Sequence, residues 1–119
     1  MLPNRMNLSK TTEDQLKLLK SRTGISPNVS SRIAFFRSVE SGFTYSEESA
    51  KKLDGGMVLD KVTWLGDTQL VTELILKQAY PELDEKEIMA AWAAHVEDGI
   101  ASIRNHRQLS QLALEMNVS

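Results

Sequence analysis

The chain has 119 residues, of which 41% are apolar and 25% charged, and it contains no cysteine. This balance is typical of one folded domain, and it excludes disulfides, thiolate zinc sites and a cysteine nucleophile. No apolar run approaches the roughly 20 residues of a membrane span, and residues 1–10 lack the apolar centre of a signal peptide, so we expect a cytoplasmic protein without membrane contact.

The formal net charge of −2 hides an asymmetry along the chain. Residues 1–37 hold seven Lys or Arg against two acidic residues, a balance of +5, whereas residues 38–119 hold seven against fourteen, a balance of −7. A basic third on an acidic body favours binding of a polyanion on one face. The alternative is that short helices simply carry solvated charges.

Residues 5–9 alternate polar and apolar side chains, which is the pattern of a half-buried strand. The pattern places Met6 and Leu8 toward the core. It places Arg5, Asn7 and Ser9 outward.

Two helices are expected next. Thr11 or Thr12 caps the first, which runs to Thr23 and ends at Gly24. Its leucines point to two sides, since Leu18 lies about 100° from the others. The second begins at Ser26-Pro27 and ends at Gly42.

The apolar arc of the second helix spans about 160°, too wide for one short partner helix. A single short strand also lacks hydrogen-bond partners. Pairing of the N-terminal strands of two copies would solve both problems, and this is the pattern of a ribbon-helix-helix dimer. In β-ribbon proteins the strands enter the major groove of DNA, where Arg and Asn can bind guanine and adenine edges.

The rest of the chain is expected to be mainly helical. Residues 43–53 are irregular or a short helix, Asp54-Gly55-Gly56 is a turn, and residues 57–64 are a short strand or extended segment. A helix from Asp67 or Thr68 to just before Pro81 packs one apolar face, and another begins at the cap Asp84. The first face comprises Leu70, Val71, Leu74 and Ile75; the second comprises Ile88, Trp92, Val96, Gly99 and Ile103.

From these elements we predict one domain over residues 1–119. Residues 1–42 form a ribbon-helix-helix-like DNA-binding unit of one short strand and two helices. Residues 43–119 form a helical extension for packing and oligomerisation. The tail from Arg107 places Leu109, Leu112, Ala113 and Met116 at helical spacing, as a docking helix or a frayed end.

Three lysines, Lys10, Lys17 and Lys20, are the main candidates for phosphate binding. Cations on a rigid helix suit a DNA backbone, because each neutralised phosphate releases counterions. The N-terminus of the second helix, at Ser26, could add backbone N–H groups. The alternative is that Glu13 and Lys17 form an ordinary surface ion pair.

No catalytic or metal constellation is evident, so we expect neither an enzyme nor a cofactor. The two histidines, His95 and His106, do not match a metal-binding spacing. His95 borders the apolar stripe of its helix, which is more typical of a histidine at the edge of a core. The tryptophans are expected in the core.

The sequence resembles the DndE family of the bacterial DNA phosphorothioation (Dnd) system. The resemblance covers residues 1–105 and rests on Arg5–Ser9, Leu19–Asn28, Ser31–Ala34 and, more weakly, Val62–Asp67. Its most specific part is Arg-Thr-Gly-x-x-Pro-Asn at residues 22–28.

The resemblance implies a part in replacing a non-bridging phosphate oxygen of DNA with sulfur. It implies as partners a cysteine desulfurase, a sulfurtransferase-like protein and an ATPase, together with a homotetramer of ribbon-helix-helix fold that binds duplex DNA, nicked duplex above all. The family supplies no catalytic motif to transfer, and without cysteine the chain cannot carry a persulfide. Four assembled chains could cover the strands, which favours Lys17 and Lys20 over Asn7 as DNA contacts.

Three alternative functions are compatible with the same residues. A ribbon-helix-helix transcription regulator or antitoxin would bind a palindromic operator through Asn7. An assembly scaffold would use the basic face for acidic partner proteins, and a nicking enzyme would relax supercoiled DNA.

Overall fold

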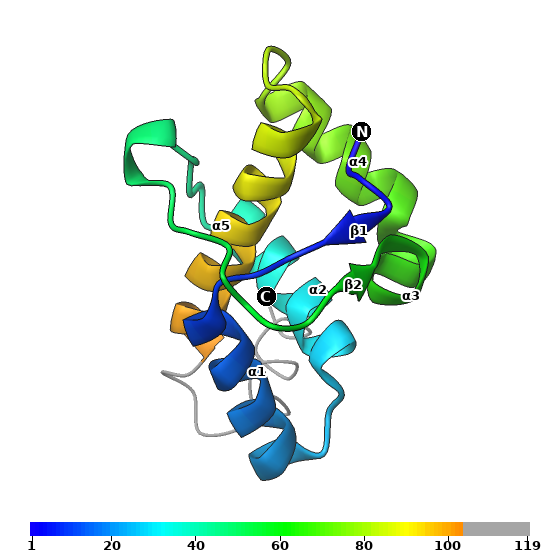
Figure 1. The fold of residues 1–119 in the computed structure, drawn as a ribbon, viewed down its shortest axis with the longest axis vertical. Coiled ribbons are helices and arrows are strands. Elements are labelled where there is room, and N and C mark those ends of the chain that lie inside the picture. The colour runs from blue at the N-terminus through cyan, green and yellow to red at the C-terminus, as the bar shows by residue number, and fades with distance from the viewer. Residues whose placement is uncertain (104–119) are drawn as a thin grey trace.

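The computed structural model describes residues 1–103, which are mainly helical with one small antiparallel sheet (Figure 1). The elements in chain order are β1 (Arg5–Met6), α1 (Lys10–Thr23), α2 (Pro27–Glu40), the 3-10 helix η1 (Glu47–Ser49), β2 (Leu59–Asp60), α3 (Lys61–Leu65), the 3-10 helix η2 (Gly66–Thr68), α4 (Gln69–Ala79) and α5 (Glu85–Ile103). The predicted tail and His106 lie outside the described residues. Within residues 1–103, no helix is long and apolar enough to cross a membrane.

The N-terminal strand finds its partner inside its own chain. β1 pairs antiparallel with β2, Arg5 opposite Asp60 and Met6 opposite Leu59. Further backbone bonds flank the pair: the Lys61 N–H donates to the Asn4 carbonyl, and the Gly55 N–H donates to the Leu8 carbonyl. The expectation that a second copy must complete this strand is therefore wrong, because Leu59–Asp60 supplies the missing partner. The prediction that residues 57–64 are a strand or extended segment is wrong from Lys61 onward, where α3 begins.

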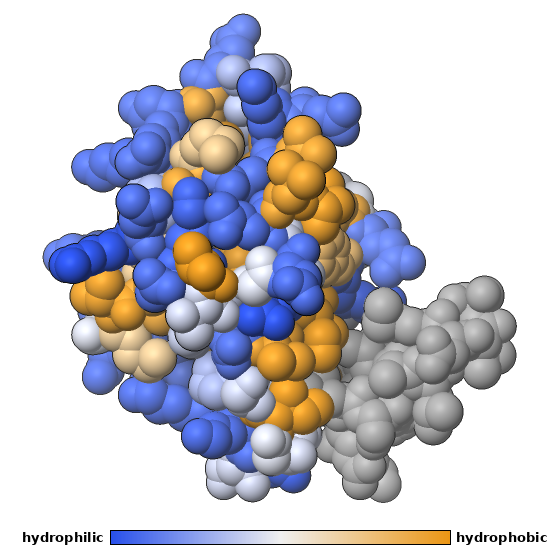
Figure 2. All heavy atoms as spheres, turned by 90° about the vertical axis from the view of Figure 1, so that its right-hand side faces the viewer, coloured by the Kyte–Doolittle hydropathy of each residue, from blue (hydrophilic) through white to orange (hydrophobic). Residues whose placement is uncertain are grey.

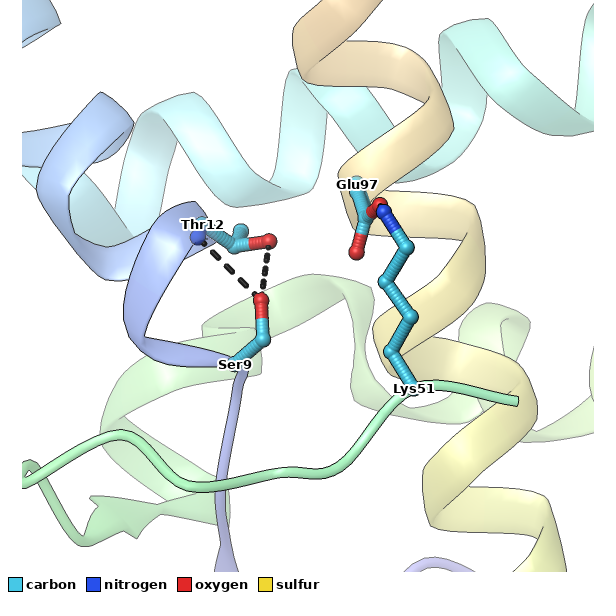
Figure 3. A network of polar contacts seen from close by, with 4 residues as sticks. All are labelled: Ser9, Thr12, Lys51 and Glu97. Carbon is cyan, nitrogen blue, oxygen red and sulfur yellow. Dashed lines mark hydrogen bonds and ion pairs between the residues drawn. The ribbon is translucent and has the colours of Figure 1, made fainter. Parts of the chain in front are cut away.

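Helix α1 begins earlier than predicted. Its cap is Ser9, whose Oγ accepts a hydrogen bond from the Thr12 N–H at 3.2 Å and lies 2.9 Å from the Thr12 hydroxyl (Figure 3). Because the strand ends at Met6, Ser9 lies outside it and can cap the helix. Serine is one of the preferred residues at this position. The predicted end is confirmed: Gly24 adopts φ +77°, which an L side chain rarely tolerates.

Helix α2 packs mainly along α5, with further contacts to α1 and α3 (Figure 1). Phe35 at 1% exposed and Trp92 at 1% are among the largest buried side chains of the core. Only part of the wide apolar arc of α2 is covered by helices of the same chain. Phe35 is buried, whereas Ile33, Phe36 and Val39 are half-buried and Val29 is 37% exposed. The buried stripe of α5 and the inward positions of Met6 and Leu8 are confirmed.

Helix α4 faces the opposite way from the prediction. Leu70 is 73% exposed and Leu74 is 52% exposed, whereas Glu73 and Leu76 face the interior. Glu73 is drawn inward by Lys61, whose Nζ lies 3.6 Å from its carboxylate, and by the Leu2 N–H, which donates to the same oxygen at 2.9 Å. Figure 2 looks onto the side that carries α3 and α4 and shows apolar side chains among polar ones at the surface.

Candidate nucleic-acid interface

The exposed cations of α1 are the first part of the candidate site. Lys10, Lys17 and Lys20 are all exposed, as the sequence predicts, and Arg22 in the last turn is exposed as well. The three lysines fall within an arc of about 80° on the helix at 3.6 residues per turn. Asp14 is the exposed carboxylate of this helix, so its surface carries a net positive charge.

The second carboxylate of α1, Glu13, is turned away from this surface. It is 4% exposed, and its oxygens accept hydrogen bonds from the Gly56 N–H at 3.2 Å and the Met57 N–H at 2.9 Å. Within residues 1–103, ion pairs form between Lys51 and Glu97 and between Lys61 and Glu73. The alternative of a Glu13–Lys17 surface pair is therefore wrong, and Glu13 does not neutralise the lysines.

The loop that binds Glu13 has a steric requirement at Gly55. A Cβ at this position would lie 2.6 Å from the Leu8 carbonyl oxygen and closer still to the Glu13 carboxylate. The adjacent Asp54 accepts a hydrogen bond from the Lys10 N–H at 2.9 Å, and this bond is the main reason that the pKa of Asp54 is lowered. The loop 54–57 thus holds the start of α1 and its inner carboxylate in place.

The outward residues of the predicted strand do not form one surface. Arg5 is exposed opposite Asp60 in β2. The Asn7 side-chain amide donates to the Met57 carbonyl at 3.2 Å. Ser9 is 7% exposed and caps α1, so its expected outward position is wrong, because the strand's alternation stops before it.

Two other basic residues of the N-terminal third have structural partners. Arg32 donates from Nε to the Trp64 carbonyl at 2.8 Å and from Nη2 to the Thr63 carbonyl at 2.9 Å, which satisfies the end of α3. Arg37 donates from Nε to the Ser102 hydroxyl at 3.4 Å. The sequence does not distinguish these arginines from the exposed cations of α1.

The start of α2 is compatible with an anion. Ser26 makes no side-chain capping bond, Pro27 occupies the first turn, and that turn contains no acidic residue. Uncapped N–H groups at a helix N-terminus attract negative charge. This end of α2 follows the cations Lys20 and Arg22 after a short connection.

His95 has the structural surroundings of a core residue. Its Nδ1 lies 2.9 Å from the Ser38 hydroxyl and its Nε2 lies 2.7 Å from the Tyr80 hydroxyl. Tyr80 accepts from the Tyr45 N–H at 2.8 Å, so its own proton is available for Nε2. Burial lowers the pKa of His95. Across residues 1–103, no group of three potential metal ligands occurs.

Comparison with known proteins identifies the family of this chain. Residues 5–111 match the family model described as DNA sulphur modification protein DndE. The chain belongs to the DndE family. No curated protein matches it.

Two crystal structures support membership of the DndE family. DndE from Escherichia coli B7A, described as involved in DNA phosphorothioation modification, is 66% identical, with a TM-score of 0.83, over 87% of this chain and 99% of that one. A DndE mutant with glycines replaced by lysine, described as involved in DNA phosphorothioation, is 63% identical, with a TM-score of 0.82 and the same coverage.

The stretch that most specifically resembles the DndE family forms the corner between α1 and α2. The Thr23 hydroxyl donates to the Leu19 carbonyl at 2.7 Å and accepts from the Ile25 N–H at 3.1 Å. Gly24 supplies the left-handed turn, and Pro27 begins α2. This corner fixes the direction of the exposed α1 lysines relative to the start of α2.

Proposed function

We propose that this DndE-family chain is a non-catalytic DNA-binding subunit of the phosphorothioation machinery in the cytoplasm. It acts with a cysteine desulfurase, a sulfurtransferase-like protein and an ATPase. The observation that carries the proposal is the charge arrangement of α1: four cations are exposed, while Glu13 of the same helix is bound inside by backbone N–H groups.

The chemistry of this surface suits phosphates more than bases. Lysines on a rigid helix contact phosphates without reading sequence, and the uncapped start of α2 adds N–H groups for a further phosphate. Two of the three strand residues that would read bases are engaged elsewhere, since Asn7 is bound to Met57 and Ser9 caps α1. A nick lowers the cost of bending a duplex, so a protein that contacts only the backbone gains contacts on nicked DNA.

Replacing Lys17 and Lys20 by alanine tests this surface. Each lost phosphate contact removes about 0.9 from the slope of log affinity against log salt, so we expect the slope to become shallower by about two. Fluorescence anisotropy with intact and nicked duplexes, each in two unrelated sequences, measures this over a salt series. Both sequences are expected to lose affinity equally.

The matched control replaces two exposed lysines outside α1, Lys77 and Lys86. These substitutions change the net charge by the same amount, and we expect them to leave the slope unchanged. Equal losses of affinity in both variants would reduce the effect to net charge and overturn the α1 site.

The non-catalytic role is tested by incubating the protein with supercoiled plasmid and magnesium. The plasmid is expected to stay supercoiled; its relaxation would overturn the non-catalytic role.

We also propose that the chain assembles into a homotetramer, in part through the α3–α4 apolar surface, defined as Val62, Leu70, Val71 and Leu74. These side chains are 44% to 73% exposed, a concentration of apolar surface that is typical of an interaction site. Closed tetramers of two-fold symmetry need a second kind of interface, for which Leu18 on α1, 49% exposed, is available.

Replacing Leu70 and Leu74 by glutamate is expected to convert the tetramer into a smaller species, because two charges cannot be buried unpaired at an interface. Light scattering coupled to size exclusion measures the mass. Gln78→Glu on the exposed side of α4 is the control and should keep the wild-type mass. An unchanged mass for the double variant would remove this surface from the assembly.

A further inference from the structure

A cavity of about 320 Å³ lies next to the start of α1, where Ser9 contributes to its wall. It opens between the segment 43–53, which follows α2, and the middle of α5. Its volume is at the lower end of those of ligand pockets. The sequence pattern does not predict this cavity, because the two segments that form its walls are about 50 residues apart in the chain.

The cavity exists because α5 presents small side chains to it. Its α5 wall consists of alanines, and Phe43 and Leu53 supply the apolar side chains opposite. The alanines are Ala90, Ala93, Ala94 and Ala101. In Figure 1 the segment around η1 projects away from α5.

A salt bridge holds the two walls together at the rim. Lys51 of the loop pairs with Glu97 of α5 (Figure 3), and the Lys51 side chain remains 67% exposed. Asp98 lies next to Glu97 and also lines the cavity. With one lysine and two carboxylates, the rim carries a net negative charge.

The acidic character continues beside the cavity. Burial, the Glu47 charge and the Asp84 charge together raise the pKa of Glu87 in the first turn of α5. Such a surface repels DNA phosphates and attracts cations. The occupant of an apolar hollow with an acidic rim is accordingly apolar at its centre and basic at its ends.

We propose that this cavity is a docking site for a partner-protein segment that inserts one or two large apolar side chains flanked by Lys or Arg. The apolar side chain fills the alanine-walled space, and the flanking cations contact Asp98 and Glu97. Aromatic and aliphatic anchors in pockets dominate many interfaces, and complementary rim charges set the specificity. The chain would thus hold DNA on α1 and a protein on α5.

The test uses the full-length protein, labelled with 15N, and two synthetic peptides. Both contain Leu-Trp-Leu; one is flanked on each side by two arginines and the other by two glutamates. Amide shifts of residues 43–53 and 90–101 are followed as each peptide is titrated. We expect the basic peptide to shift these residues and to bind at least about tenfold more tightly than the acidic one.

Two variants separate the apolar and the charged contribution. Ala94→Leu fills the space and is expected to abolish binding of the basic peptide, and Asp98→Lys is expected to weaken it about fivefold or more. Both variants keep Lys17 and Lys20, so binding of nicked duplex should be unchanged, which separates this proposal from DNA binding.

Leu74→Ala on the α3–α4 apolar surface is the control and should bind the peptide as the wild type does. Shifts that map to α4, or equal affinity for both peptides, would overturn the proposal. So would the absence of any shift with the basic peptide.

Discussion

Gly99→Ala is expected to destabilise the chain by at least about 2 kcal/mol, against the helix propensity of alanine. Gly99 lies in α5 where that helix crosses α2. A Cβ there would lie 2.6 Å from the Ala34 Cα and closer still to the Ala34 carbonyl oxygen. These are backbone atoms of α2, which cannot move aside without separating the two helices at the centre of the core.

The sign of the change in unfolding free energy distinguishes close helix packing from helix propensity. In the interior of an isolated helix, alanine is more favourable than glycine by about 1 kcal/mol. If α2 and α5 were not in close contact, the substitution would therefore stabilise the protein. Destabilisation can arise only from the crossing of the helices.

Gly56→Ala is the matched control, because a Cβ there would meet no atom within 4 Å. Its effect is expected to stay within about 0.5 kcal/mol, as for most surface changes. Urea unfolding followed by tryptophan fluorescence, at one protein concentration for all variants, gives both values. A stabilised Gly99→Ala variant would contradict the observed packing of α2 on α5.

The sequence predicts the fold well where local chemistry decides it. Gly24 and Asp84 mark helix ends because a left-handed turn and a capping carboxylate are local devices; the Asp84 carboxylate accepts from the Glu87 N–H at 2.9 Å. The buried stripe of α5 follows from its 3.6-residue period. The resemblance to the DndE family is likewise a local signal, carried by the α1–α2 corner.

The sequence does not predict the fold where residues far apart in the chain determine it. The partner of β1 lies more than 50 residues away in β2, and no periodic pattern identifies it. The burial of α4 is reversed because Glu73 is satisfied by Lys61 and by the backbone of Leu2. Pattern analysis ranks the faces of a helix by apolar content, and a carboxylate with buried partners inverts that ranking.

The candidate site shows the same division. The exposed lysines of α1 are predictable, since charged residues seldom lie inside a small domain. The burial of Glu13, which leaves Asp14 as the exposed carboxylate of α1 beside these lysines, depends on N–H groups more than 40 residues away. In the sequence, the burial of Glu13 is indicated only by the pair Gly55-Gly56, whose first member leaves space for the Glu13 carboxylate.

Lys61→Met is expected to cost about 3–5 kcal/mol, because it leaves the buried Glu73 carboxylate without its cation. The Lys61 side chain is 9% exposed, and its Nζ donates to the Leu2 carbonyl at 2.7 Å. The variant therefore loses a hydrogen bond to the N-terminal segment as well as the ion pair. Adding Glu73→Gln to this variant should restore part of the stability, because the unpaired charge is then removed.

Lys51→Met is the matched control, since it makes the same substitution in the exposed ion pair with Glu97. Exposed pairs contribute at most about 1 kcal/mol, so urea unfolding should separate the two variants clearly. Lys61 joins the N-terminal segment to α4 and contributes nothing to the α1 surface. Folded Lys61→Met protein should thus bind nicked duplex with the wild-type salt slope; a changed slope would mean that the N-terminal segment itself takes part in DNA binding.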